Sequence, residues 1–292
     1  MDFADLHMHS AYSDGDWTPS KLVQAAVGAG LGALALTDHD DIRGWEEAHR
    51  TGREQGLVVL PGVELSAWWS GVDLHLLAYG FEPTNAGLLA ILDGASSARL
   101  RRAEAIAERL TELGAPVTME SVHAIAGGAT IGRPHVARAL VEAGHVSTIR
   151  EAFDVYLADG KPACVEKANL TPEEAIRVVH GAGGVIVVAH PGILGGPEEL
   201  EPLVQMGVDG VEVRHSLHGR KSERAFDEFA RTHGLLKTGG SDFHGPRMSG
   251  LGVGSVAIPR SWWDDLLNGI DERRKRQGLV PRAWEESKVD GG

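Results

Sequence analysis

The chain has 292 residues, of which 42% are hydrophobic and 24% charged, a composition typical of a folded protein with a buried core. A formal charge of −13 at pH 7 argues against a broad phosphate-binding surface of the kind that grips a DNA duplex. The single cysteine, Cys164, excludes an internal disulfide and a cysteine-based zinc site. No apolar run approaches the roughly 18 residues of a membrane span. We therefore expect a soluble cytoplasmic protein without a membrane partner, and the sequence leaves the oligomeric state open.

Short apolar runs alternate with helical segments along most of the chain. The expected strands are Phe3–Met8, Ala33–Thr37, Val58–Leu65, Leu74–Tyr79, Val185–Ala189, Val211–Arg214 and Leu236–Gly239. Between them, Thr18-Pro19 and Thr171-Pro172 are typical helix starts, and Gly30 is a typical helix end. A succession of strand, helix and strand indicates parallel βα units and hence an α/β fold.

Residues 82–161 interrupt this alternation. Helices are expected there over Ala86–Leu113, Met119–Ala126, Pro134–Ala143 and Thr148–Leu157. We interpret 82–161 as a helical insertion in a discontinuous barrel formed by 1–81 and 162–258. Residues 259–292 are expected to form a terminal helix and tail, in which the basic run Arg273-Arg274-Lys275-Arg276 is interpreted as a solvent-exposed face.

Almost every expected strand is followed by, or contains, a side chain that can bind a metal ion. The candidate ligands are His7, His9, Asp14, His39, Glu64, His75, His190, Asp242 and His244. Taken singly, each has an ordinary structural interpretation, such as a turn for Asp14 or a hydrogen-bonded core histidine for His190. In a βα barrel, however, the downstream ends of the strands form one active face, so these residues are expected to converge.

Two local patterns strengthen the prediction of a metal site. His7 and His9 alternate along a strand and therefore point to the same face. Glu64 ends an apolar run, where a carboxylate is costly unless positive charge meets it, and a position bridging two cations would provide that charge. The set is large enough for two or three divalent ions, and its nitrogen and oxygen donors suit manganese, zinc and iron alike.

The motifs Asp5-Leu6-His7-Met8-His9-Ser10, Thr37-Asp38-His39-Asp40, Pro61-Gly62-Val63-Glu64, Ala189-His190-Pro191 and Ser241-Asp242-Phe243-His244 are similar to those of the PHP (polymerase and histidinol phosphatase) superfamily. The resemblance spans residues 1–257. It implies a distorted (β/α)7 barrel with the helical insertion over the C-terminal face. The resemblance also implies three ion positions, formed by His7, His9, Glu64 and Asp242, by Glu64, His75 and His190, and by Asp14, His39 and His244.

Within that superfamily, the run from Gly132 to Arg138 resembles a bacterial branch containing 3′,5′-nucleoside bisphosphate phosphatases and 5′→3′ exoribonucleases. The resemblance implies hydrolysis of a 3′,5′-bisphosphate such as pAp to the 5′-monophosphate, or of short 5′-phosphorylated RNA. A metal-bridging hydroxide would be the nucleophile, since clustered cations lower the pKa of bound water. The catalytic set would be His7, His9, Asp14, His39, Glu64, Asp242 and His244.

Residues outside the ligand set are assigned to the substrate. Arg133 and His135 are expected to bind a phosphate, because arginine offers a planar fork that matches two phosphate oxygens. The alternative is that Arg133 is an exposed helix charge. Arg214 and His215 are expected to bind substrate, and His218 to protonate the leaving oxygen.

Two other functions remain open at this stage. One is a histidinol-phosphate-type monoesterase that prefers substrates other than nucleotides. The other is a regulatory module that binds metal without catalysis, although its ligand set would be expected to have decayed.

Overall fold

The computed structural model describes residues 2–165, 170–246, 251–280 and 282. One eight-stranded sheet runs in the order β7-β6-β5-β4-β3-β2-β1-β8. The strands are β1 Asp2–Asp5, β2 Ala33–Leu36, β3 Val58–Trp69, β4 Val72–Tyr79, β5 Val185–Val188, β6 Gly210–His215, β7 Leu236–Gly240 and β8 Ile258–Pro259. The amide of Leu6, after β1, donates to the carbonyl of Gly239 in β7 at 3.2 Å, so the sheet curls into a nearly closed barrel. The α/β barrel expected from the sequence is confirmed.

Strand β4 departs from the expected parallel arrangement. It is antiparallel to both β3 and β5, whereas β1–β2–β3 and β5–β6–β7 are parallel. Strands β3 and β4 form a hairpin whose turn residues, Ser70 and Gly71, have φ of 51° and 87°. The expectation that His75 follows the downstream end of a parallel strand is therefore wrong. It lies in the first half of β4, paired with Ser66, and reaches the barrel mouth because β4 runs in the opposite direction.

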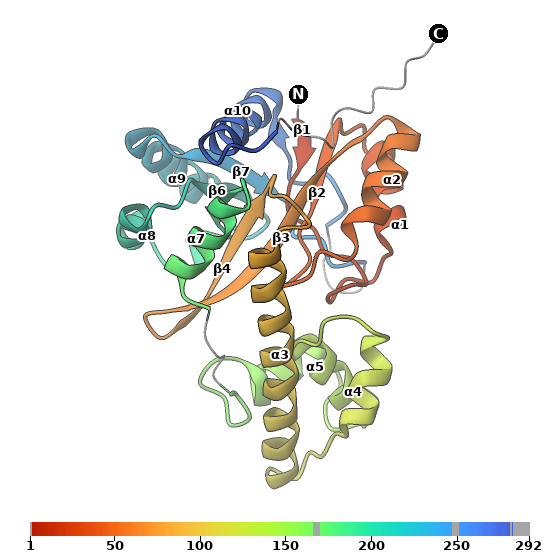
Figure 1. Ribbon diagram of the computed structural model, residues 1–292. Coiled ribbons are helices and arrows are strands. Elements are labelled where there is room, and N and C mark those ends of the chain that lie inside the picture. The colour runs from red at the N-terminus through yellow and green to blue at the C-terminus, as the bar shows by residue number, and fades with distance from the viewer. Residues whose placement is uncertain (1, 166–169, 247–250, 281, 283–292) are drawn as a thin grey trace.

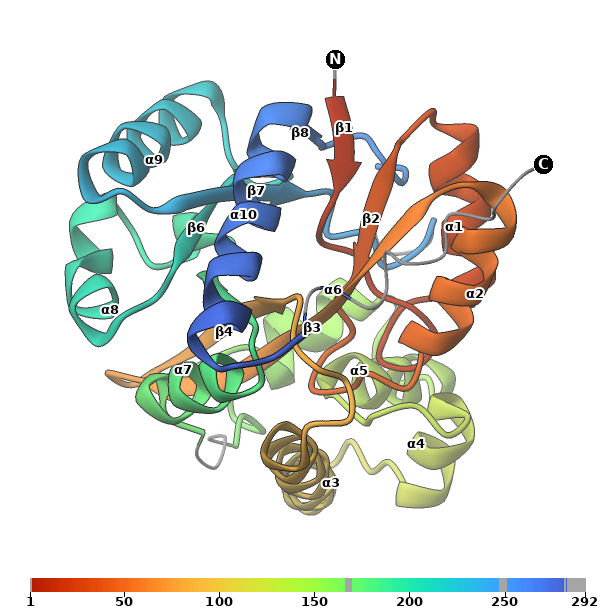
Figure 2. The ribbon, with the colours of Figure 1, turned by 45° about the horizontal axis from the view of Figure 1, so that its top comes forward.

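Helices cover the outside of the barrel (Figures 1 and 2). They are α1 Pro19–Gly28, α2 Trp45–Gln55, α7 Pro172–Gly181, α8 Glu201–Met206 and α9 Arg220–His233, with 3₁₀ turns η2 Pro191–Ile193 and η3 Pro197–Leu200. Helix α1 begins as expected, since the side chain of Thr18 accepts a hydrogen bond from the amide of Lys21. Its apolar face, including Leu22, packs with Leu36 and Val59 of the sheet. Each such buried side chain contributes about 1.5–3 kcal/mol to folding.

The helices between β4 and β5 pack around a core of their own. They are α3 Ala86–Glu112, α4 Met119–Ala126, α5 Arg133–Glu142 and α6 Ile149–Ala152, followed by the π-helical turn η1 Phe153–Leu157. Ile106 and Leu110 of α3 meet Val136 and Leu140 of α5 in that core. Figure 1 shows these helices grouped on one side of the sheet. The division of the chain into separate domains at 82 and 161 stays a prediction.

The terminal helix, α10 Arg260–Arg276, packs against the barrel instead of exposing its basic run. Arg274 is only 1% exposed, and its Nε donates to the carbonyl of Val280 at 2.9 Å. Its Nη1 donates to the carbonyl of Gly80 at 3.5 Å. Arg273 pairs with Asp209 at 2.5 Å. The interpretation of the run as a solvent-exposed face is therefore wrong for these two arginines, because the helix turns them toward the sheet.

The tail expected over 283–292 lies outside the described residues. In the ranges that the structure describes, no helix has the length and apolarity needed to cross a bilayer.

Candidate metal centre

The predicted ligands converge at one end of the barrel. Three overlapping groups place ligand atoms within 4.8 Å of one another; they are His9, Asp14, His39 and His244, then His7, His9 and Glu64, then His39, Glu64 and His75. Asp242 joins His7 and His215 in a fourth such group. His190 completes the predicted set, with its Nε2 3.0 Å from Glu64 Oε1.

His7, His9, Glu64 and Asp242 surround the first proposed ion position. Nε2 of His7 lies 3.3 Å from Glu64 Oε2 and 3.3 Å from Asp242 Oδ1. Nε2 of His9 lies 3.2 Å and 3.1 Å from the same two oxygens. Donors at such separations match the edges of a tetrahedron around an ion with bonds of about 2.0 Å, the length found for zinc with histidine and carboxylate ligands.

Glu64 also faces a second position through its other oxygen. Oε1 lies 2.7 Å from His75 Nδ1 and 3.0 Å from His190 Nε2. The two ring nitrogens are 3.2 Å apart. Oε2 faces His7 and His9 while Oε1 faces His75 and His190, an arrangement that suits the bridging role expected from the apolar strand setting of Glu64.

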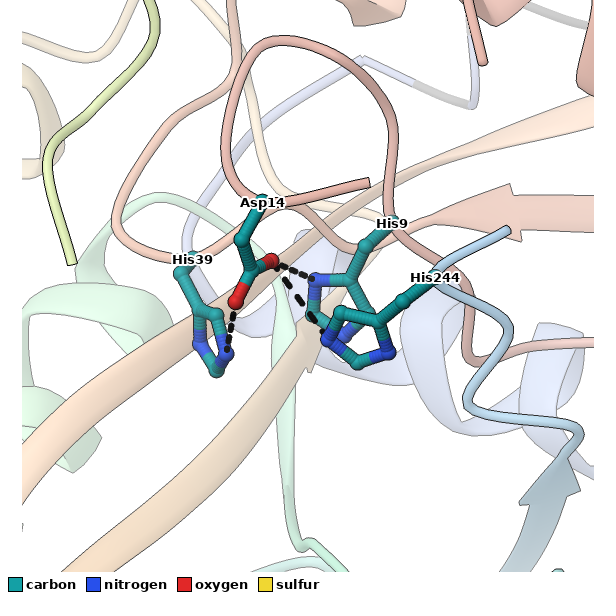
Figure 3. Close-up of side chains that lie close together, drawn as sticks. All are labelled: His9, Asp14, His39 and His244. Atoms are coloured by element: carbon teal, nitrogen blue, oxygen red, sulfur yellow. Dashed lines mark ion pairs between the residues drawn. The ribbon is translucent and has the colours of Figure 1, made fainter. Parts of the chain in front are cut away.

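Asp14, His39 and His244 form the third group, shown in Figure 3 together with His9. Asp14 Oδ2 is 3.8 Å from His39 Nε2, and Asp14 Oδ1 is 3.4 Å from His244 Nε2. His9 Nδ1 lies 3.7 Å from Asp14 Oδ1, so this group adjoins the first position.

Buried polar atoms without hydrogen-bond partners show that the cluster fits cations. Within the described part of the chain, such atoms in this cluster include Nε2 of His7 and His9, Nδ1 of His39 and Oε2 of Glu64. A buried polar atom left unsatisfied costs about 1–3 kcal/mol. Divalent ions bound among these nitrogen and oxygen atoms would satisfy them together. The side chains in this arrangement do not satisfy one another.

The electrostatics of the cluster also call for positive charge. Burial raises the pKa of Glu64, but the neighbouring His39, His75 and His7 outweigh it and hold that pKa well below the usual range. Burial opposes charge on His9 as well, yet the adjacent carboxylates of Asp242 and Glu64 outweigh it and raise the pKa of His9 to about 10. The site therefore favours ionised carboxylates and a cationic partner, a role that protons or metal ions can fill.

Two ligand-bearing turns hold the backbone in an unusual conformation. His190 and Asp242 have φ of 27° and 52°, in a region that residues other than glycine seldom adopt. The amide of Asp242 donates to the carbonyl of His7 at 2.8 Å, which ties the turn to the first strand. Such strain costs about 1–3 kcal/mol per residue and is found where function requires a particular side-chain direction.

The two residues expected to hold phosphate lie at the start of α5. The ring of His135 is buried and its Nδ1 accepts a hydrogen bond from the amide of Gly132 at 3.0 Å. Arg133 is not a free surface charge. Its Nη2 lies 3.3 Å from Asp73 and its Nη1 2.7 Å from Asp159, so it spans from the helical segment to strand β4.

The three residues predicted after β6 have different environments. His215 belongs to the cluster, with Nε2 3.3 Å from Asp242 Oδ2. Arg214 contacts residues outside the cluster, since its Nη1 donates to the carbonyl of Ala257 at 2.7 Å and its guanidinium lies over the ring of Trp262. Both ring nitrogens of His218 are engaged by backbone groups, the carbonyl of Val213 at 2.9 Å and the amide of Gly192 at 3.1 Å. His218 therefore supports the loop after His190 and has no nitrogen directed at a substrate.

Three charged residues that the sequence analysis did not assign also support the site. Asp38 is buried and accepts hydrogen bonds from the hydroxyls of Ser10 and Ser13, which hold the loop carrying Asp14. Arg99 of α3 reaches the barrel and donates to Asp40 at 2.6 Å, next to His39. Glu212 of β6 is 0% exposed and contacts His7. Its signal was present in the sequence, because it is a carboxylate within the apolar run Gly210–Val213, as Glu64 is within its own.

Comparisons with known proteins identify the family. The family model for the PHP domain matches residues 5–161. The chain is 35% identical to the 3′,5′-nucleoside bisphosphate phosphatase of Chromobacterium violaceum, over 90% of this chain and 95% of that protein. It is 36% identical to the 5′-3′ exoribonuclease Rnm of Escherichia coli, over 83% of this chain and 85% of that protein. A solved structure from Bifidobacterium adolescentis, described as a metal-dependent phosphoesterase, aligns with a TM-score of 0.84 and 34% identity over 92% of this chain and 96% of that one. The resemblance read from the motifs is confirmed, and the chain belongs to the PHP domain family of phosphoester hydrolases.

Proposed function

We propose that this phosphoesterase hydrolyses 3′,5′-nucleoside bisphosphates, such as pAp, to the 5′-monophosphate and inorganic phosphate. The observation that carries the proposal is the buried cluster of unsatisfied histidine and carboxylate donors at the barrel mouth, beside arginines of the helical segment. The similarity to a bisphosphate phosphatase over 90% of the chain supports this substrate class. Short 5′-phosphorylated RNA is the second candidate substrate, favoured by the similarity to an exoribonuclease.

The metal ligands in this proposal are those predicted from the sequence, His7, His9, Asp14, His39, Glu64, His75, His190, Asp242 and His244. They would hold two or three ions of manganese, zinc or iron. Bound ions would polarise the phosphoryl group and lower the pKa of water at the site. The role of the chain is to fix these donors in place before the substrate arrives, with Glu64 shared between two positions.

Arg133 is proposed to bind the phosphate that is not hydrolysed. Its partner Asp159 is 69% exposed, so a substrate phosphate can replace that carboxylate at the guanidinium without burying an unpaired charge. His135, at the same helix start, lies close enough for Asp14 to influence its pKa, which burial lowers. The start of α5 therefore carries both the proposed phosphate-binding arginine and a histidine close to the third group of ligands.

His215 is proposed to donate a hydrogen bond within the site. Its Nδ1 accepts from the amide of Leu217 at 3.1 Å, so in the neutral ring the proton resides on Nε2. That nitrogen faces Asp242 at 3.3 Å, and it can donate either to this carboxylate or to a substrate oxygen.

A substrate panel with metal-defined protein tests the proposal. Apoprotein would be loaded separately with Mn²⁺, Zn²⁺ or Fe²⁺ and assayed with pAp, nucleoside monophosphates, short 5′-phosphorylated RNA and histidinol phosphate. The expected result is the highest kcat/KM for the bisphosphate, with phosphate as the product. Equal or faster turnover of histidinol phosphate would reject the nucleotide assignment, and no turnover of any ester would favour a regulatory module.

A further inference from the structure

Glu212 lies beneath the proposed metal centre, in the middle of strand β6. Its side chain is 0% exposed, so the carboxylate is shielded from water. A carboxylate in such surroundings is tolerated only where donors meet both of its oxygens. The two donors that it meets belong to two different proposed metal ligands.

The first donor is the ring of His7. Glu212 Oε1 lies 2.9 Å from His7 Nδ1, and both side chains are completely buried. A carboxylate accepts at this distance, which places the proton of the neutral imidazole on Nδ1 and leaves the lone pair on Nε2. Nε2 is the atom that faces Glu64 and Asp242, at 3.3 Å from each. Glu212 thus selects the form of His7 that can bind a metal ion.

The second donor is the backbone of His190. Its amide donates to Glu212 Oε2 at 2.6 Å. His190 has a φ of 27°, so the turn needs external contacts to hold it in this conformation. In that conformation its Nε2 lies 3.0 Å from Glu64 Oε1, at the second proposed ion position.

We propose that Glu212 is a positioning residue that connects the two ion positions on either side of Glu64. One oxygen fixes the tautomer and direction of His7 at the first position, and the other fixes the turn that carries His190 at the second. The inference rests on the proposed metal centre but is independent of which phosphate ester is hydrolysed. It predicts that a change at Glu212 weakens binding at both positions, although Glu212 itself touches neither ion.

The informative variant is Glu212→Gln, which keeps the size of the side chain. Glutamine has one acceptor oxygen, so it can satisfy only one of the two donors and turns an NH₂ group toward the other. The matched control is Asp209→Asn, which alters a partly buried carboxylate immediately before the same strand. Asp209 contacts His180 and Arg273 and none of the proposed ligands.

Metal binding is measured with Mn²⁺ or Zn²⁺ alone, by competition with a chelator and by metal analysis of dialysed protein. For Glu212→Gln we expect dissociation constants raised about 10–100-fold at both Glu64-linked positions. Asp209→Asn should stay within about twofold of the wild type, since its contacts are far from the ligands. The absorption spectrum of the Co²⁺-substituted protein should change in Glu212→Gln alone, because the ligand field depends on how His7 is held.

Metal affinities and a Co²⁺ spectrum equal to wild type in folded Glu212→Gln would overturn the proposal. Circular dichroism of the apoprotein establishes folding. If Glu212→Gln does not fold, Glu212→Asp provides the same comparison, since it keeps the charge but is too short to reach both donors. Unchanged affinity in Glu212→Asp would then reject the role. The metal measurements contain no substrate, so a wild-type protein that binds metal but leaves pAp intact would contradict the proposed function alone.

Discussion

The two ends of the barrel both contain mostly buried histidine and aspartate, yet they differ in how those groups are satisfied. At the end opposite the mouth, Asp209 accepts from His180 at 2.7 Å, from the amide of Ile186 at 2.9 Å and from Arg273 at 2.5 Å. At the mouth, the Nε2 atoms of His7 and His9 and the Oε2 atom of Glu64 have no hydrogen-bond partner among the described residues. The first cluster is complete as it stands, whereas the second is complete only with cations.

The comparison shows that the number of histidines and carboxylates does not identify a metal site. At the mouth, the histidine nitrogens and carboxylate oxygens face one another. Among the described residues, no arginine or other proton donor lies between them. Arg273 supplies a permanent positive charge to Asp209. Around Glu64, five histidines occupy the corresponding places, and histidine can give up its proton to bind a metal ion.

Replacing one carboxylate at each end of the barrel should give the largest difference, because one residue is expected to serve catalysis and the other stability. Asp242→Asn is expected to reduce kcat/KM by a factor of about 10³ or more, because it removes a charged ligand from the reaction centre. Asp209→Asn should retain wild-type kcat/KM and lower the free energy of unfolding. Steady-state kinetics and urea unfolding of both variants measure this. Comparable losses of activity in the two variants would contradict the distinction.

Removal of metal should affect only the mouth. We expect EDTA to abolish phosphate release and to lower the midpoint of thermal unfolding, since ions bound only to the folded state stabilise it. Mn²⁺ or Zn²⁺ should restore both properties. Fewer than two ions per chain in fully loaded, active protein would argue against the bridging position assigned to Glu64.

Loss of the proposed phosphate-binding arginine should have a smaller effect. Arg133→Ala is expected to raise KM for pAp about tenfold, with a smaller change in kcat, because it removes a charged contact outside the reaction centre. Arg150→Ala is the matched control, since Arg150 lies in the same helical segment and is 92% exposed. A KM for Arg133→Ala equal to that of the control would show that Arg133 has only its structural contacts with Asp73 and Asp159.

The smallest expected effect is the pH dependence of the free energy of unfolding that Asp209 contributes, at the end of the barrel opposite the mouth. Burial raises the pKa of Asp209, but the hydrogen bond from His180 and its other partners outweigh it and lower the pKa below the ordinary value of about 4. The stabilisation is therefore fully present above pH of about 4 and is lost as the pH falls through the lower, folded-state pKa. Asp209→Asn should lower the free energy of unfolding by about 1–3 kcal/mol at pH 7 and by less near pH 3. Urea unfolding at both pH values checks this; a constant difference would contradict it.

Sequence reasoning singled out the candidate ligands because each stood out against its local pattern. His7 and His9 alternate on a strand, and Glu64 and His190 end apolar runs, so a single rule about strand ends placed most of them together. The same rule gave the wrong account of His75, because nothing local shows that β4 turns back as a hairpin and enters the barrel in the opposite direction.

The supporting residues were harder to predict because their roles depend on tertiary contacts. Arg99 lies 59 positions from Asp40 along the chain, and its helix looks like an ordinary amphipathic segment until it is packed on the barrel. Arg274 sits in a basic run that would normally be exposed. Glu212 was also not assigned, although it lies in an apolar run as Glu64 does and so carried a signal that could have identified it.

The closure of the barrel has a consequence for the order in which the protein matures. Leu6 pairs with Gly239, and the ring of His9 stacks on that of His244, so the segment after β1 cannot make these contacts until residues 239–244 have been synthesised. During synthesis at about 5–20 residues per second, the ribosome must add most of the polypeptide before these partners exist. Metal binding by the whole cluster would therefore follow translation of β7, and until then β1 can pair with β2 but not with β7 or β8.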